Sequence, residues 1–216
     1  RPTLEALKEN IPVMMERIYF PKNMRWMDMD ERFVRPIHWI VALYDGQIVP
    51  FTFAGIQSGN QSRGHRFTNP GPFTVKHFSE LNSVLSAQGI EIDPEKRRSL
   101  IDQSIKEMAL AENLKLSEDQ DLLDEVTFLV ESPYPIMGKF AEDFLELPAS
   151  IHITCMKKHQ RYFSVQDQNG RITNRFVAVN NTPVKDQSVS VKGHQRVLKA
   201  RLEDARFYFR EDRKMP

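Results

Sequence analysis

The stretch that decides the fold is residues 162–179, YFSVQDQNGRITNRFVAV. Two runs rich in β-branched and aromatic residues, Tyr162–Gln166 and Ile172–Val179, lie on either side of Asn169-Gly170. Asn and Gly tolerate the backbone angles of a tight turn, so the stretch predicts an antiparallel hairpin.

A second hairpin is predicted nearer the N-terminus, where the runs Ile37–Tyr44 and Gln47–Phe53 flank Asp45-Gly46. Asp-Gly suits a two-residue type I′ turn, which requires positive φ at both positions. The next segment, Gly55–Pro72, has many glycine and proline breaks and is predicted to be a long loop. A short strand is expected at Phe73–Lys76.

Helices are predicted where apolar residues recur every three or four positions or where capping residues occur. The expected helices cover residues 3–18 with a break or kink at Pro12, 77–88, the segment opened by Asp93-Pro94, the segment capped by Ser117 and Gln120, 147–159, and 191–213.

Helices and hairpins occur in blocks, without regular strand–helix alternation, so the predicted fold class is α+β. It consists of a mixed or antiparallel sheet built from hairpins, with several packed helices. Residues 1–216 are treated as a single module, with a possible internal boundary near 89–93 or 131–135.

The 30 Lys and Arg nearly balance the 29 Asp and Glu, so a nucleic-acid role would have to rest on local clusters of cations. The single cysteine, Cys155, excludes an internal disulfide and is typical of a reducing cytoplasm, where we expect the protein. No run is long enough to span a membrane. The first residue is Arg1, and the last residues still read as helix, so we expect a part of a longer chain.

The basic segment Gly59–Phe67 has the glycine spacing of a P-loop, but His65 and Arg66 replace its Lys and Ser/Thr. It therefore does not predict NTP cleavage. Arg63, His65 and Arg66 remain candidate phosphate contacts, and the alternative is a turn-rich loop with solvated or locally paired arginines.

Two further cationic clusters are candidate RNA contacts. Lys157, Lys158 and Arg161 precede Tyr162 and Phe163, a mixture of charge and aromatic faces used to bind single-stranded RNA. The last helix carries a stripe of cations at three- and four-residue spacing. Its members are Arg196, Lys199, Arg206, Arg210 and Arg213. The alternative is a solvated face held by Lys199–Glu203 and Glu203–Arg206 contacts.

His152, Cys155 and His159 would share one face of a helix. Such a set could hold zinc, or Cys155 and His159 could act as nucleophile and base. No fourth Cys or His lies nearby, and a buried cysteine that packs as a small hydrophobe is the commoner arrangement.

Several segments together resemble the β subunit of bacterial glycyl-tRNA synthetase, from about Phe20 to Asp212. They are FPKNMRW at 20–26, RPIHW at 35–39, SGN at 58–60, RGHRF at 63–67, MKKHQRYF at 156–163 and RVLKARLEDARF at 196–207. His194 and Tyr208 stand where the family is expected to have Asn and Phe.

The resemblance implies a B3/B4-like module in an N-terminal part of the β subunit of an α2β2 ligase that charges tRNA(Gly) with glycine. ATP and Mg would be used through the α subunit, and this part would bind no cofactor of its own. The implied roles are tRNA binding and assembly with the α subunit. Two alternatives are a scaffold without tRNA contact and an editing-type hydrolase that uses Cys155 and His159.

Overall fold

The computed structural model describes residues 2–214, which form two compact units that meet between Ile90 and Glu91. The division falls between residues 90 and 91, inside the interval 89–93 noted from the sequence. The unit ending at Ile90 is called unit 1, and the unit beginning at Glu91 is called unit 2. The described residues form no closed barrel, and the α+β class is confirmed.

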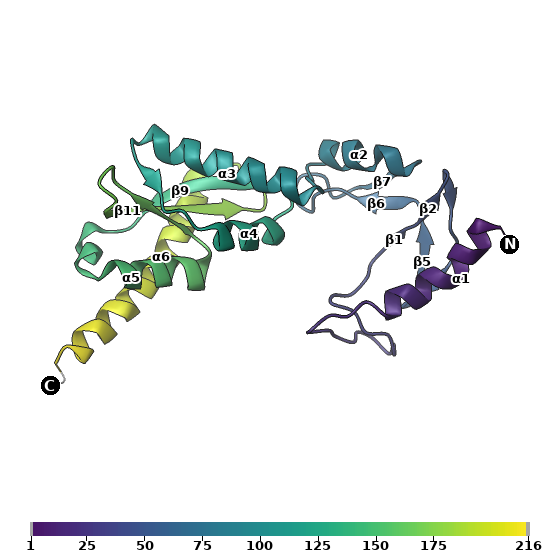
Figure 1. Ribbon diagram of the computed structural model, residues 1–216, viewed down its shortest axis with the longest axis horizontal. Helices are drawn as coiled ribbons and strands as arrows, with labels where there is room; N and C mark the ends of the chain where they lie inside the picture. Colours follow the sequence, from purple (N-terminus) through teal and green to yellow (C-terminus); the bar gives the residue numbers. More distant parts are fainter. Residues whose placement is uncertain (1, 215–216) are drawn as a thin grey trace. The chain divides into compact units, whose positions relative to one another are not determined.

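Unit 1 combines one long helix, several two- to four-residue strands and a short helical segment (Figure 1). Its elements are α1 (Thr3–Glu16), β1 (Ile40–Val41), β2 (Leu43–Tyr44), β3 (Gln47–Ile48), β4 (Thr52–Phe53), β5 (Ile56–Gly59), β6 (Gln61–Arg63), β7 (Pro72–Thr74), η1 (Phe78–Glu80) and α2 (Leu81–Ala87). Helix α1 continues through Pro12, so the helix predicted there is not divided.

The predicted type I′ turn is present, because Asp45 and Gly46 have φ angles of 47° and 73°. The predicted hairpin around it is wrong in extent, since only β2 and β3 pair across that turn. Instead β1 pairs in parallel with β5, and β4 turns back onto β5 through Ala54, whose φ is 48°. Parallel strands are joined by a long connection rather than a tight turn, so no turn motif in the sequence predicts their pairing.

The predicted loop Gly55–Pro72 is also wrong over much of its length. Strand β5 and strand β6 occupy its first half, and β6 pairs in antiparallel fashion with β7. The true loop is confined to residues 64–71, between β6 and β7. The prediction treated each glycine as the end of a regular element, whereas Gly59 is part of strand β5.

Unit 2 has a four-stranded antiparallel sheet of order β8-β10-β11-β9 with helices on both faces (Figure 1). Its elements are α3 (Pro94–Ala111), β8 (Lys115–Leu116), α4 (Gln120–Leu129), β9 (Tyr134–Lys139), η2 (Glu142–Glu146), α5 (Ala149–Thr154), the π-helical turn η3 (Cys155–Gln160), β10 (Phe163–Gln166), β11 (Ile172–Asn180) and α6 (Gln187–Asp212). The predicted hairpin of β10 and β11 is confirmed.

Alternate residues of β11 supply the cores on the two faces of this sheet. Phe176 and Ala178 pack against α6 and the segment η2–α5–η3. Val177 packs with residues of α3 and α4 on the opposite face. Tyr162 and Phe163 also belong to opposite cores, so the sheet is buried on both sides.

Helix starts in unit 2 were predicted with mixed success. Asp93 caps α3 as expected, since its carboxylate accepts hydrogen bonds from the N–H groups of Glu95 at 2.9 Å and Lys96 at 3.2 Å. The capping box of Ser117 and Gln120 is wrong. Asp119 caps α4 instead and accepts from the N–H of Leu122 at 3.0 Å. Asp is as good an N-cap as Ser, so both positions satisfied the sequence pattern.

The approach of β9 to β11 depends on Gly138. A Cβ at this position would lie 2.3 Å from Cζ of Phe176, a ring with no exposed surface. We expect Gly138→Ala to lower the free energy of unfolding by about 1–3 kcal/mol, because the ring must leave its place in a filled core. Urea unfolding of the purified chain measures the change.

Gly193→Ala is the matched control. Gly193 is exposed within α6, and a Cβ there meets no atom within 4 Å. Alanine should therefore raise the free energy of unfolding by about 0.5–1 kcal/mol, through helix propensity alone. An equal loss of stability in both variants would contradict the assignment of Gly138 as a packing position.

Candidate nucleic-acid interface

The loop of residues 64–71 is held in a fixed shape by its own backbone and by the end of α2. Asn69 donates its N–H to the carbonyl of His65 at 2.8 Å, and His65 donates its N–H to the carbonyl of Gln88 at 3.1 Å. The Asn69 side chain reaches the same Gln88 carbonyl at 3.2 Å. A Cβ at Gly64 would lie 2.4 Å from the carbonyl oxygen of Asn69, so the turn has no room for a larger residue.

The candidate contacts in this loop and at the end of β6 have different environments. His65 is 1% exposed, and its Nδ1 lies 3.4 Å from the N–H of Phe67, so its ring supports the loop from inside. Arg63 donates to the carbonyl of Pro70 at 3.2 Å and spans the loop. Arg66 is exposed, and Phe67 beside it is 74% exposed. The loop therefore presents one cation and one aromatic face to solvent.

The cations around η3 are mostly engaged within unit 2. Lys157 forms an ion pair with Asp119 at 2.8 Å, which raises the pKa of its amine. Arg161 pairs with Glu125 at 2.8 Å, while Lys158 is exposed. The side chain of Asp119 thus both caps α4 and binds Lys157.

The cationic stripe of α6 is also largely paired. Lys199 lies 3.5 Å from Glu203, as the alternative interpretation expected. Arg206 pairs with Asp143 at 2.7 Å, in place of the expected Glu203, and its guanidinium lies 4.2 Å from the centre of the Phe144 ring. The hydrogen bond from Arg206 holds the pKa of the Asp143 carboxyl below its ordinary value.

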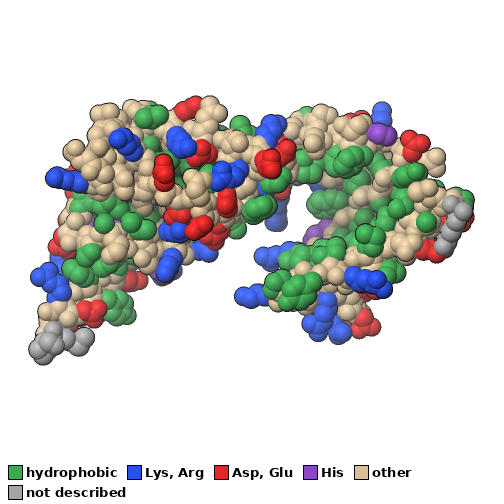
Figure 2. Space-filling view, viewed as in Figure 1, with side chains coloured by type: hydrophobic (Ala, Val, Ile, Leu, Met, Phe, Trp, Pro, Cys, Tyr) green, Lys and Arg blue, Asp and Glu red, His purple; other side chains and the backbone are tan. Residues whose placement is uncertain are grey.

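Arg210 pairs with Glu146 at 2.6 Å, and Arg213 lies 5.7 Å from the centre of the Phe209 ring. Arg196 is exposed, and none of the ion pairs among residues 2–214 includes it. Basic and acidic side chains are accordingly interspersed on the visible face of unit 2 in Figure 2. Unit 2 therefore offers dispersed cations rather than a continuous basic stripe.

The set His152, Cys155 and His159 does not form a site. Cys155 is 5% exposed, and burial raises the pKa of its thiol. His152 has no exposed surface and stacks on Phe140 at 5.4 Å, whereas His159, near the end of η3, is exposed. Within the part of the chain that the structure describes, no three His, Cys, Asp or Glu side chains are placed to hold a metal ion.

A partly buried polar network joins α6 to the sheet, and the sequence did not reveal it. Tyr162 Oη lies 2.7 Å from Nδ1 of His194, and Nε2 of His194 lies 2.9 Å from Oδ1 of Asn180. The Asn180 amide in turn donates to Ser190 at 3.0 Å. Since an amide oxygen only accepts, Nε2 carries the proton and Nδ1 accepts from the tyrosine. Burial raises the pKa of Tyr162 to about 12.

Comparison with known proteins gives one consistent result. The sequence model of the family described as glycyl-tRNA synthetase beta subunit matches residues 1–216. The chain is 48% identical over 215 residues to the glycine–tRNA ligase beta subunit of Geobacter sulfurreducens, and 46% identical over 215 residues to that of Syntrophotalea carbinolica. Each alignment covers 100% of this chain and 31% of the relative.

These matches define the chain as part of an aminoacyl-tRNA synthetase subunit. The chain belongs to the family of glycyl-tRNA synthetase beta subunits, and it spans about a third of the length of the curated relatives, 31% in each alignment. The resemblance inferred from the sequence is confirmed. No helix formed by residues 2–214 has the length and apolarity needed to cross a membrane.

The position of Cys155 predicts an unreactive thiol. Its Sγ lies 4.0 Å from the carbonyl oxygen of Arg201, beneath α6, and burial disfavours the thiolate that would attack a reagent. We expect no reaction with a disulfide reagent such as DTNB while the chain is folded, and one thiol per chain in urea. Rapid labelling of the native protein would contradict this and reopen a nucleophilic role for Cys155.

Burial lowers the pKa of His152 and of His194, so the unfolded chain binds more protons than the folded chain as the pH falls below about 6.5. Stability should therefore decrease between pH 7.5 and pH 5.5 in urea unfolding. The nitrogens of His152 have no hydrogen bond of normal geometry, although carbonyls of Leu147 and Phe144 favour its charged form.

His152→Phe should weaken this pH dependence, because it removes one buried titrating group and breaks no normal hydrogen bond. The exposed His159, replaced by Gln, is the control from the neighbouring turn. If the free energy of unfolding of His152→Phe depends on pH as strongly as that of the wild type, His152 is not a source of the pH dependence.

Proposed function

We propose that this chain is the N-terminal part of a glycine–tRNA ligase β subunit that contributes tRNA binding and assembly to the ATP-dependent charging of tRNA(Gly). Family membership supports the enzyme assignment. The α subunit of the α2β2 enzyme would supply the glycine and ATP site, with its Mg.

The observation that carries tRNA binding is the loop of residues 64–71. It holds Arg66 and the 74% exposed Phe67 side by side on a backbone fixed by buried His65. A guanidinium can bind a phosphate while a neighbouring aromatic ring stacks on an unpaired base. A loop that is already ordered loses little conformational entropy when it binds.

The same loop is unsuited to nucleotide hydrolysis. It lacks the Lys and Ser/Thr of a P-loop, and it joins two strands rather than a strand and a helix. The loop therefore lacks the groups that a P-loop uses on a nucleotide, in keeping with the proposal that ATP is used through the α subunit.

The editing-type alternative receives no support from the structure. An acyl-transfer nucleophile must be reachable and must have a base within hydrogen-bond distance. The Cys155 thiol is enclosed and its Sγ faces the carbonyl of Arg201, whereas His159 is exposed. We therefore retain tRNA binding and assembly as the proposed roles.

Arg66→Ala in the intact α2β2 enzyme should weaken tRNA binding and reduce the slope of log K against log salt by about 0.7–0.9, the contribution of one phosphate contact. Phe67→Ala should weaken binding by about 1–3 kcal/mol, the range for one stacked base, with little change in that slope. Filter binding at several salt concentrations measures both effects.

Arg171→Ala is the matched control, because Arg171 is an exposed arginine of the turn between β10 and β11. It should bind tRNA as the wild-type enzyme does. If Arg66→Ala and Phe67→Ala retain wild-type affinity and slope, the loop is not a tRNA contact.

A further inference from the structure

Helix α1 is only half covered in unit 1. None of its fourteen residues, all of them described, is buried. Its apolar side, which includes Leu7, Ile11 and Met15, packs against a small core of four buried residues around Val49 and Phe51. Met14, on another side of the helix, is 65% exposed. Unit 1 therefore has more apolar surface than its own core can bury.

An apolar groove of about 610 Å³ runs along this side of α1. Its walls are α1, the segment 40–44 and the start of η1–α2, and every residue that lines it is hydrophobic. Phe78 at the rim is 75% exposed and Tyr44 is 45% exposed. A polar metabolite would find almost no group to orient it here, whereas the apolar face of a helix would fill such a groove. In Figure 2 hydrophobic side chains are prominent on the visible face of unit 1.

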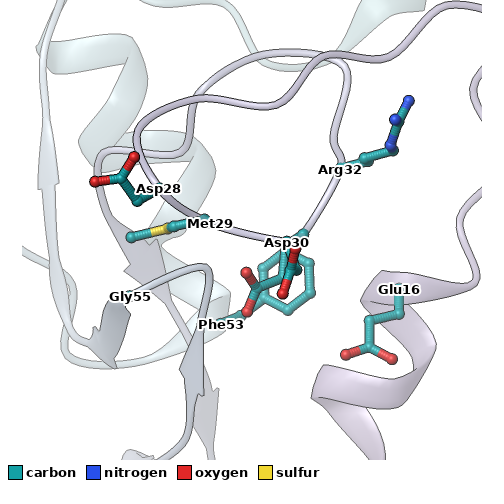
Figure 3. A pocket seen from close by; sticks show the side chains of 8 residues that line it. Glu16, Asp28, Met29, Asp30, Arg32, Phe53 and Gly55 are labelled. Atoms are coloured by element: carbon teal, nitrogen blue, oxygen red, sulfur yellow. The ribbon is translucent and has the colours of Figure 1, made fainter.

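A second hollow, of about 660 Å³, lies beside Glu16 at the C-terminal end of α1 (Figure 3). Met15 lines the groove and the next residue, Glu16, lines the hollow. Likewise, Phe51 lines the groove and Phe53 lines the hollow. The two spaces share no lining residue, and both are bordered by α1 and by the segment 51–53.

The hollow carries an excess of negative charge. Four carboxylates line it, from Glu16, Asp28, Asp30 and Glu31, with a single guanidinium from Arg32. Figure 3 shows Arg32 extending away from Asp28 and Asp30, and its guanidinium donates to Asn23 at 3.4 Å.

Only one of these carboxylates is engaged by a cation. Asp30 lies 3.5 Å from Arg25, in an exposed pair, whereas Glu16, Asp28 and Glu31 form no ion pair within residues 2–214. The three carboxylates without an ion pair favour a cationic group in the hollow.

We propose that the groove and the hollow together form one docking site for an amphipathic helix of the α subunit. The apolar face of that helix fills the groove, and Lys or Arg side chains at one of its ends lie against Glu16, Asp28 and Glu31. This inference rests on the proposed function, because the family is that of a beta subunit, which assembles with a second kind of chain. It adds the surface on this chain and the chemistry of the partner that fits it.

Charge reversal tests the acidic end of the site. In full-length β subunit, Glu16→Lys combined with Asp28→Lys should weaken binding to the α subunit about tenfold at low ionic strength, and less at about 0.5 M salt, where the attraction is screened. Glu118→Lys combined with Asp212→Lys is the matched control, since it changes the net charge equally at exposed positions of unit 2. The control should bind as wild type in sedimentation or calorimetry.

Truncation at the rim tests the apolar part. Phe78→Ala combined with Tyr44→Ala should weaken binding about tenfold or more, as buried aromatic anchors do, with little effect on folding because both side chains are exposed. Phe128→Ala is the control, because Phe128 is also 75% exposed but lies on α4 of unit 2. Amide exchange of α1 should slow when the α subunit is added.

Three results would overturn the proposal. Wild-type affinity in both site variants would remove the groove as the docking surface. Slow exchange of α1 in the isolated full-length β subunit, unchanged by the α subunit, would assign the groove to another part of the β chain. Tighter tRNA binding by the Lys variant, with unchanged affinity for the α subunit, would make the hollow an RNA-facing surface.

Failure of the inference and failure of the proposed function give different results. If wild-type β subunit does not bind the α subunit, both the proposed assembly role and the proposed docking site are wrong. The tRNA measurements on Arg66 and Phe67 stay independent of either outcome, because they concern a loop outside both the groove and the hollow.

Discussion

Unit 2 depends on the burial of β11 on both faces, and the contact that secures it is the stack of Phe176 between Gly138 and Tyr162. The Phe176 and Tyr162 rings are 4.8 Å apart and inclined by 15°, and the Phe176 ring covers the backbone of Gly138. Tyr162 then binds His194 of α6. The close approach of β9 to β11 at Gly138 therefore helps to position α6 on the sheet. Phe176 packs on Gly138, Tyr162 stacks on Phe176, and His194 of α6 contacts Tyr162.

Local patterns in the sequence predicted local structure well. The Asp45-Gly46 turn, the Asp93 cap and the hairpin of β10 with β11 each depend on neighbouring residues, and each is present. The pairing of β1 with β5 could not be predicted in this way, because its two strands meet through tertiary packing. The turn at Ala54 was missed because a non-glycine residue rarely adopts positive φ.

The candidate RNA contacts could not be fully assessed from the sequence either, because their ion pairs join residues distant in sequence. A count of cations along η3 and α6 cannot distinguish a free charge from a paired one. Lys157 and Asp119 are 38 residues apart in sequence, and Arg206 and Asp143 are 63 apart. Their carboxylate partners come from elements that fold against them, so only the tertiary structure reveals that these charges are engaged. By contrast, the exposed pair Arg66 and Phe67 lies in the loop that the sequence had already indicated.

The enclosed position of Cys155 has a practical consequence for the study of this molecule. It is the only cysteine among the 216 residues, and its sulfur lies under α6. A cysteine introduced on the surface of this chain would therefore be its only accessible thiol. Fluorophores, spin labels or photocrosslinkers could be attached at a chosen position without first removing the native cysteine, so distances to tRNA or to a neighbouring subunit could be measured on an otherwise unaltered core.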